Sequence, residues 1–308
     1  MIYTLSLNPA IDRMYYVPDL TCAAPIRTDD YHVQAGGKGI NVVKVLRQLQ
    51  EPTTALGFLG GAAGTHIEQT LKALGATLNF TPIKEETRTC LAFQDQHNQT
   101  LEVLETGPTI QKKESERLKK QLKKTLPKNS ILVISGSLPK NIDDDFYFDI
   151  IQSLKENAID VILDTSGIPL RAALAAKPYL VKPNLAELIA LTDTDLSEES
   201  AQLNAMQTLL DQGAQNVVLS LGEGGALFAN HQTSYKITVP KIATPNPIGS
   251  GDSFIAGFAY ALKHGYNIRE ALRFASALGV SNAKNKEIGK IEVEDLEILQ
   301  TQITVKKR

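Results

Sequence analysis

The chain has 308 residues, of which 43% are hydrophobic and 21% are charged, and its formal net charge is −2. This composition is typical of a globular α/β protein, and the small net charge excludes a bulk attraction to nucleic acid or to an anionic membrane. Because the first residues carry neither a basic region nor a long apolar run, we expect no signal peptide, no membrane span and a location in the cytoplasm.

The cysteines and histidines give no sign of a disulfide framework or a zinc site. Cys22 and Cys90 stand far apart and form no CxxC pair, and the five histidines are not grouped at the spacing of metal ligands. We therefore expect reduced thiols and no structural zinc.

The first predicted element is a strand over residues 2–7, which ends at Asn8-Pro9. Asp12 follows in a stretch that reads as a polar turn. Residues 13–34 contain short extended pieces without the spacing of a helix.

A glycine-rich stretch around Lys38 comes next and leads into an apolar helix over residues 42–49. Glycines let the backbone approach a ligand closely, so Lys38 and Asn41 are candidates for bonding hydroxyl groups or an anion. The alternative is a glycine-rich turn with a solvated lysine. Because no Ser or Thr follows Lys38, the stretch is not a Walker A loop.

The middle of the chain predicts a strand over residues 54–58 and a helix over residues 67–74. Residues 87–93 and 100–104 alternate like the two strands of a hairpin. Arg88 opens the first of these strands, where a lone arginine usually serves only solubility.

Residues 111–126 form a lysine-rich helix that could suggest a nucleic-acid patch. Glu114 and Glu116 are mixed in, however, and no aromatic side chain is present to stack on a base. A solvated helix face is the better interpretation.

From residue 131 onward, strands alternate with helices. We expect strands at 131–135, 161–163, 179–182 and 216–221, with helices at 146–154, 170–174, 184–191 and 198–212. Continuous apolar strands between amphipathic helices predict a parallel sheet covered on both faces. Ligands of such sheets bind beyond the carboxyl ends of the strands. The polar residues at or just after strand ends are Ser137, Asp164, Lys182, Asn184, Ser220 and Gly222.

Residues 244–262 combine a glycine turn with a buried helix. Gly249 and Gly251 permit a tight turn, and apolar residues recur at helical spacing from Phe254 onward. The first N–H groups of this helix could hold an anion, and Asp252 in the first turn could accept a proton. The alternative is that Asp252 is an ordinary acid at the start of a helix.

Six stretches, in this order along the chain, resemble the ribokinase and phosphofructokinase-B superfamily of carbohydrate kinases. They are residues 8–12, 36–41, 135–139, 182–187, 220–226 and 249–253. The resemblance implies one α/β kinase domain over residues 1–308, a three-layer sandwich with a mainly parallel central sheet. It also implies a small β-sheet lid from about residues 10–34 and 87–105, and a homodimer through that lid.

The resemblance further implies ATP and Mg²⁺ as cofactors and a role for each matching residue. Asp252 is the expected catalytic base, and the amides of Gly249, Ser250 and Gly251 are expected to stabilise the transferred phosphoryl group. The expected substrate-binding residues are Asp12, Arg27, Gly37, Lys38, Asn41, Arg88 and Ser137. The expected nucleotide-binding residues are Lys182, Asn184, Glu187, Ser220, Gly222, Gly225 and Asn282, with Asn184 and Glu187 holding Mg²⁺ through water.

The sugar is indicated by Arg88, which matches the arginine of the sugar-phosphate kinases in this family, and by Arg27, which could reach across a dimer. Thr-Arg-Thr-Cys at 87–90, Glu-Thr-Gly-Pro at 105–108 and Gly-Ser-Gly-Asp at 249–252 look most like the tagatose-6-phosphate kinases. We expect phosphorylation of tagatose 6-phosphate at C1.

Other functions stay open at this point. The chain could be a 1-phosphofructokinase or a 6-phosphofructokinase, or a sugar-phosphate sensor without activity. A nicotinamide-dependent dehydrogenase is disfavoured because no GxGxxG follows the first strand.

Overall fold

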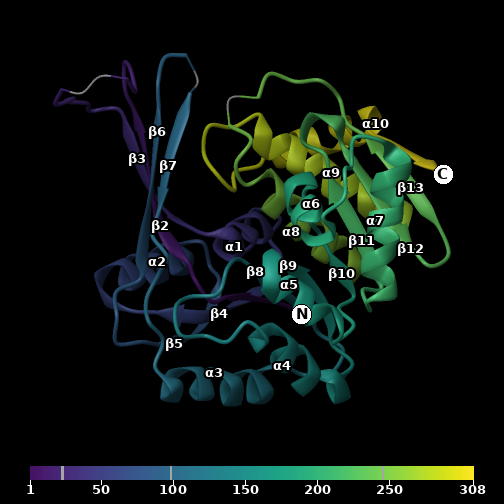
Figure 1. Ribbon diagram of the computed structural model, residues 1–308. Coiled ribbons are helices and arrows are strands. Elements are labelled where there is room, and N and C mark those ends of the chain that lie inside the picture. Colours follow the sequence, from purple (N-terminus) through teal and green to yellow (C-terminus); the bar gives the residue numbers. More distant parts are fainter. Residues whose placement is uncertain (22–23, 98, 245) are drawn as a thin grey trace.

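Strands and helices alternate along most of the computed structural model, which describes residues 1–21, 24–97, 99–244 and 246–308 (Figure 1). The strands are β1 (Ile2–Ser6), β2 (Ala10–Tyr16), β3 (Tyr31–Gly36), β4 (Thr53–Leu59), β5 (Thr77–Pro82), β6 (Arg88–Gln94), β7 (Thr100–Leu104), β8 (Ile131–Ser135), β9 (Asp160–Asp164), β10 (Leu180–Val181), β11 (Asn216–Ser220), β12 (Ala226–Asn230), β13 (Ser234–Thr238) and β14 (Thr304–Lys307). The helices are α1 (Lys38–Gln48), α2 (Gly61–Ala73), α3 (Lys112–Thr125), α4 (Phe146–Ser153), α5 (Gly167–Leu174), α6 (Leu185–Thr192), α7 (Glu199–Asp211), α8 (Ser250–Lys263), α9 (Ile268–Ala283) and α10 (Leu296–Gln302).

The larger sheet has the strand order β14-β13-β12-β11-β10-β9-β8-β1-β4-β5. Strands β11 through β5 are parallel, whereas β12, β13 and β14 pair antiparallel at one edge. The predicted mainly parallel sheet is confirmed. The sequence analysis missed β5, β13 and β14, where polar residues interrupt the apolar runs that marked the central strands, and it also overlooked the short apolar run of β12.

The layers follow from strands that are buried on both sides. Every residue of β1 and β8 is buried, so each face of the sheet needs a cover of helices. Helices α3 to α7 pack on one face, and α1, α2, α8, α9 and α10 pack on the other. This is the three-layer sandwich that the sequence predicts. In the described part of the chain, no helix is both long and apolar enough to cross a membrane.

A separate four-stranded sheet, with the order β3-β2-β6-β7, extends from the main body and forms the lid (Figure 1). Strands β2 and β6 run parallel, and the other neighbours run antiparallel. Strand β3 ends at Gly36 and α1 begins at Lys38, so the lid is joined directly to the glycine stretch.

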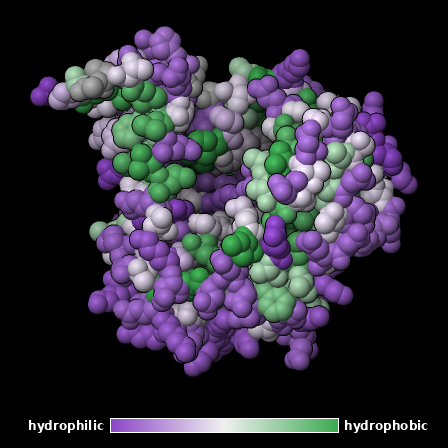
Figure 2. Space-filling view, in the orientation of Figure 1, coloured by the Kyte–Doolittle hydropathy of each residue, from purple (hydrophilic) through white to green (hydrophobic). Residues whose placement is uncertain are grey.

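The two faces of the lid differ in chemistry. One face carries Asp12, and its cross-strand partners Gln34 and Cys90 lie on the same face. On the other face, Tyr15 stacks on Tyr31 and on Phe93, and the exposed side chains of Leu101 and Val103 continue the apolar surface. Figure 2 shows hydrophobic side chains gathered along the lid and a hollow between the lid and the main body.

Two local predictions need comment. The polar turn predicted at Asp12 is wrong, because pairing with both β3 and β6 keeps the backbone extended through this residue. Cys90 is a free, buried cysteine, and the prediction for Cys22 lies outside the described residues.

Candidate active site

The glycine turn before α8 is made by Gly249, as the sequence predicts, whereas Gly251 lies inside α8 and has no positive φ. Gly249 has φ +83 and is the last residue before α8, and a Cβ added to it would lie 2.6 Å from Cγ2 of Ile288. Only glycine tolerates both constraints. The amide of Ser250 donates to the carbonyl of Pro247 at 3.3 Å. The first turn of α8 therefore presents its N–H groups at the carboxyl edge of the sheet, where the field favours an anion.

Asp252 lies in this first turn and is 6% exposed. Nδ2 of Asn41 donates to Oδ2 of Asp252 at 2.8 Å. Burial, together with the negative charge of Asp164, raises the pKa of Asp252 to about 6, although Asn41 and two lysines oppose the shift. A carboxylate with such a pKa is ionised at neutral pH and is a stronger base than an ordinary aspartate.

Asp164, at the end of β9, lies between two lysines. Nζ of Lys38 is 3.2 Å from Oδ1 of Asp164, and Nζ of Lys182 is 3.7 Å from Oδ2. Burial by itself would raise the pKa of Asp164, but the two lysines outweigh it and hold the pKa below its usual value. Nζ of Lys38 also lies 3.7 Å from Oε1 of Glu187. Ion pairs of Lys38 therefore connect the glycine stretch with β9 and with α6.

Lys182 connects this charge cluster to the glycine turn. A Cβ added to Gly251 would lie 3.1 Å from Nζ of Lys182, so the ammonium group lies against the first turn of α8. An anion held by that turn would meet a buried positive charge as well as backbone N–H groups.

The expected nucleotide-binding residues gather at the neighbouring strand ends. Asn184 and Glu187 form a capping box at the start of α6, in which each side chain accepts from the backbone N–H of the other. Oγ of Ser220 donates to the carbonyl of Pro183, and Gly222 opens a short turn at φ +57. At Gly225, φ is +85 and a Cβ would lie 2.1 Å from the carbonyl oxygen of Ile237.

Asn282 is fully buried behind the glycine turn. Its Nδ2 donates to the carbonyl of Ile248 at 2.9 Å, and its Oδ1 accepts from the N–H of Gly289 at 2.8 Å. The side chain therefore supports the turn from behind. Its predicted position near the adenine stays a prediction.

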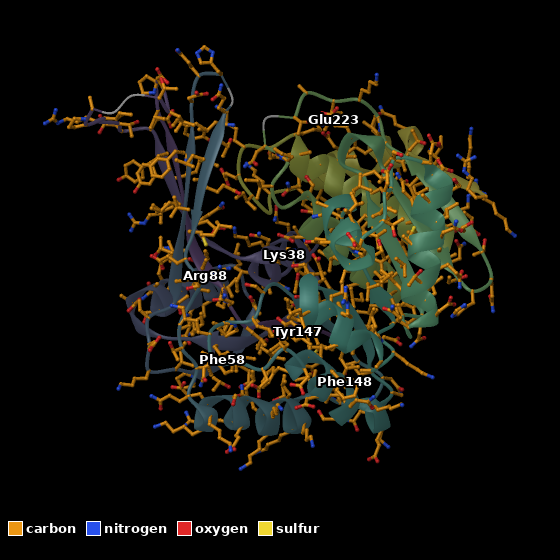
Figure 3. The ribbon with its side chains drawn as sticks, viewed as in Figure 1. Lys38, Phe58, Arg88, Tyr147, Phe148 and Glu223 are labelled. Atoms are coloured by element: carbon orange, nitrogen blue, oxygen red, sulfur yellow. The ribbon has the colours of Figure 1, made fainter. Side chains whose placement is uncertain are left out.

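The expected sugar-binding residues lie at the base of the lid. Burial raises the pKa of Asp12, while Lys44, the N–H of Gly37 and Arg88 oppose the shift. Arg88 is half-buried and donates to the carbonyls of Asn8 at 3.1 Å and Glu105 at 2.8 Å. Figure 3 shows Arg88 at the base of the lid and Lys38 closer to the main body.

Of two further residues expected to bind the substrate, Ser137 lies near Arg88 and Arg27 lies on the opposite face of the lid. Nδ2 of Asn8 donates to Oγ of Ser137 at 3.2 Å, which links Ser137 to the carbonyl that Arg88 contacts. Arg27 lines a hollow of about 760 Å³ with Tyr15, Phe93 and Leu101, on the apolar face of the lid. The structure does not bring Arg27 to the site of its own chain.

A family comparison shows which kind of protein carries this arrangement of a buried carboxylate, a glycine turn and two lysines. The model of the pfkB family of carbohydrate kinases matches residues 5–290. The chain belongs to the pfkB family. This pfkB kinase is therefore a sugar phosphotransferase, and the dehydrogenase alternative loses its support.

Relatives of this pfkB kinase act on phosphorylated sugars. It is 39% identical to the tagatose-6-phosphate kinase of Staphylococcus epidermidis over 308 residues, which is 99% of each chain. It resembles phosphofructokinase-2 of Escherichia coli, solved with fructose-6-phosphate, at TM-score 0.90 and 28% identity over 97% of this chain and 98% of that one. The same Escherichia coli enzyme has been solved as a tetrameric inhibited form.

The structure of this pfkB kinase is also similar to two other solved structures. A possible 1-phosphofructokinase from Thermotoga maritima has TM-score 0.91 and 26% identity over 100% of this chain and 99% of that one. Ribokinase of Arabidopsis thaliana has TM-score 0.78 and 21% identity over 97% and 98%, which shows the shared fold alone. The predicted ribokinase-like fold is confirmed.

The sequence analysis did not recognise the importance of two buried charged residues of this pfkB kinase, Asp164 and Lys44. Asp164 was noted only as a strand-end residue, and Lys44 was read as part of an apolar helix. The available signal for Asp164 was a carboxylate directly after an apolar strand, and the structure adds that it pairs with Ser135 at the end of β8. The available signal for Lys44 was a lysine placed between Val43 and Val45 in an apolar stretch, one helical turn after Asn41.

The capping box of this pfkB kinase fits a magnesium site that depends on water. Within the described ranges, no three His, Cys, Asp or Glu side chains are grouped to bind a metal. Glu187 keeps Oε1 outside the capping box, and hard oxygen donors suit Mg²⁺. Magnesium retains several waters and binds through few carboxylates, so this donor set fits the ion.

Proposed function

We propose that this pfkB kinase transfers the γ-phosphoryl group of ATP to the C1 hydroxyl of tagatose 6-phosphate and gives tagatose 1,6-bisphosphate. The observation that carries the proposal is Asp252, a buried carboxylate with a pKa of about 6 in the first turn of α8. The 39% identity to a tagatose-6-phosphate kinase along the whole chain supports this choice of sugar.

In the proposed reaction, Asp252 accepts the proton of the C1 hydroxyl. The freed oxygen forms a bond to the γ-phosphorus, the bond to the bridging oxygen of ATP breaks, and ADP leaves. The backbone amides of Gly249 and Gly251, and that of Ser250 in exchange for its bond to Pro247, stabilise the charge on the transferred group. Lys182 adds a positive charge beside them. Asn184 and Glu187 would hold Mg²⁺ through water, and the ion would supply positive charge to offset part of the phosphate charge.

The sugar binds between the lid and the start of α1. Asp12, Asn41 and the N–H of Gly37 bond its hydroxyl groups, with Lys38 and Ser137 alongside. Arg88 binds the 6-phosphate, since arginine's planar fork suits a phosphate. Arg27 contributes from a partner subunit.

We further propose a homodimer through the apolar face of the lid. Tyr31, Leu101 and Val103 are 50%, 53% and 48% exposed on that face, which leaves a hydrophobic surface without a cover in the single chain. Arg27 borders this surface, so a second copy would bring it toward the neighbouring site.

A second candidate substrate is a fructose phosphate. The structural likeness to phosphofructokinase-2 and to a possible 1-phosphofructokinase supports 6-phosphofructokinase or 1-phosphofructokinase activity at the same site. All three reactions use the same base and glycine turn, so the sugar phosphate distinguishes them.

A coupled ADP-release assay with tagatose 6-phosphate, fructose 6-phosphate, fructose 1-phosphate and the free sugars tests the proposal. We expect the highest kcat/KM with tagatose 6-phosphate and little turnover of free sugars. The Asp252→Asn variant, purified in the same way, controls for contaminating kinases. A clear preference for either fructose phosphate would replace the tagatose assignment, and no ADP release with any sugar phosphate would overturn the proposed substrate class.

A further inference from the structure

Lys44 is a buried lysine, one helical turn after Asn41 in α1, and only 8% of it is exposed. Its Nζ donates to three acceptors from three parts of the chain. These are Oε1 of Gln34 in the lid at 3.1 Å, Oδ1 of Asn41 at 3.4 Å, and the carbonyl of Ile288 at 3.2 Å. A buried lysine with such partners needs an explanation beyond solubility.

The contact with Asn41 decides how its amide is oriented. An asparagine side chain presents an oxygen at one end and an NH₂ group at the other, and only the NH₂ end can donate to a carboxylate. An ammonium group has donors and no acceptor, so Lys44 binds the oxygen end of Asn41. The NH₂ end is then directed at Asp252, where it lies 2.8 Å from Oδ2.

Charges around both groups are consistent with this arrangement. Burial lowers the pKa of Lys44 to about 8, against the attraction of Asp12, Asp252 and Glu287, so the lysine is mostly charged at neutral pH. The charged groups that face Asp252 are Asp164, Lys38, Lys182 and Lys44.

Lys44 is also tied to the glycine turn. Beyond its bond to Ile288, a Cβ added to Gly289 would lie 3.2 Å from Cδ of Lys44, so this segment packs closely on the lysine. The N–H of Gly289 donates to Asn282, and Nδ2 of Asn282 donates to the carbonyl of Ile248 and to Oγ of Ser250. Hydrogen bonds thus connect Lys44 with both the base and the turn that would hold the phosphoryl group.

We propose that Lys44 is a positioning residue that fixes the amide of Asn41 and thereby holds Asp252 in its ionised form, without contacting sugar or nucleotide. The inference rests on the proposed role of Asp252 as the base. Losing the donated hydrogen bond destabilises a carboxylate, so the base would be protonated at higher pH.

The test is the pH dependence of kcat in wild type, Lys44→Met, Lys44→Arg, Asn41→Leu and the Lys44→Met/Asn41→Leu double variant. Lys44→Met keeps the length of the side chain without its donors. We expect it to move the acid limb of kcat up by about one pH unit, with about a fivefold lower kcat at pH 6. Lys44→Arg restores donor and charge, and should return the limb toward wild type.

The double variant shows whether Lys44 acts through Asn41. We expect Asn41→Leu to move the acid limb by a similar amount, and Lys44→Met to add little in that background, since two residues in one hydrogen-bond chain are not additive. Additive shifts would overturn the inference. A higher KM for the sugar phosphate with an unmoved acid limb would also overturn it, because Lys44 would then be a phosphate ligand.

Folding and the proposed function are controlled separately. Thermal unfolding of each variant identifies any that are not folded. If Lys44→Met does not fold, the test is the acid limb of kcat in Asn41→Leu. An acid limb that stays at the wild-type pH in this variant overturns the inference. If Asp252→Asn keeps full turnover, the proposed function fails. If Asp252→Asn is inactive and the limb is unmoved in folded Lys44→Met, only the role of Lys44 fails.

Discussion

The site has a floor, formed by four buried or half-buried charged residues of the main body, and a lid above it. The two regions differ in how their side chains are held. On the floor, Asp252, Asp164, Lys38 and Lys182 are close to one another, and each has an oppositely charged or hydrogen-bonding partner. In the lid, a single thin sheet has polar residues toward the site and exposed apolar residues on the opposite face. The comparison indicates that the charged groups of the floor are held in place by one another, whereas the lid leaves an apolar face uncovered in the single chain.

Close packing explains why the floor is preorganised. A Cβ added to Gly257 of α8 would lie 2.8 Å from Cα of Ala275 in α9, so the two helices cross at short range. Phe254, Ile255 and Phe258 are buried against the sheet layer. The base is therefore carried by a helix that has little freedom to shift.

The largest expected effect comes from removing the base on the floor. Asp252→Asn should lower kcat by about 10²–10⁴ while the protein still binds the sugar phosphate and ATP. In wild type, kcat should fall as the pH drops below about 6, because the carboxylate is then protonated. Steady-state kinetics with calorimetric binding would check this, and an unchanged rate would remove Asp252 from the mechanism.

The same substitution should stabilise the fold. The pKa of Asp252 is raised in the folded protein, so its contribution to stability is complete below the unfolded value and is lost as the pH rises through about 6. At pH 7 we expect Asp252→Asn to raise the free energy of unfolding by about 1–3 kcal/mol. Chemical denaturation at pH 4 and pH 7 would reveal a gain confined to the higher pH.

The next largest effect tests whether Arg88, at the base of the lid, binds the phosphate of the substrate. Arg88→Ala should raise KM for the sugar phosphate by about 10–100-fold, the usual value of charge-assisted hydrogen bonds, and leave KM for ATP nearly unchanged. Arg88→Lys is the matched control, since it keeps the charge without the planar fork. Equal losses for both substrates would mean that Arg88 serves only its two carbonyl contacts.

A smaller effect tests the apolar face of the lid. Leu101→Asp places a charge on that face and should weaken self-association by at least about tenfold, with little change in the unfolding of the main body. Leu104→Asp is the control, because Leu104 is 59% exposed on the same strand but opposes Cys90 on the site-facing side. Sedimentation at several concentrations would measure both variants, and equal behaviour would contradict a dimer through this face.

The smallest expected effect lies outside both regions. Glu51 is 3% exposed and accepts hydrogen bonds from Lys263 and His264. Burial raises its pKa, but these two partners outweigh burial and lower it, so its stabilisation is present at neutral pH and is lost as the pH falls below about 4. Glu51→Gln should cost about 1 kcal/mol at pH 7 and leave kcat unchanged. A difference that persisted at pH 3 would point to packing instead.

Much of the fold could be predicted because its signals are local. Apolar runs marked β1, β8, β9 and β11, and helical spacing after the glycines placed Asp252 in the first turn of a helix, where α8 has it. Strands β13 and β14 were missed because they lie near the edge of the sheet and carry mixed sequences, although the buried run of β12 was also overlooked. Asp12 was misread because pairing with β3 and β6 outweighed its polar neighbours.

The sequence by itself determined the alternation of strands and helices, the glycine turn and the residues able to move a proton or hold an anion, since these depend on spacing and on φ at single residues. Only the tertiary structure decided which of them meet. Lys38 pairs with Asp164 across 126 positions, and Lys44 reaches the carbonyl of Ile288 across 244. No local pattern encodes such pairs, because they exist only after parallel strands have brought their carboxyl ends to one edge of the sheet.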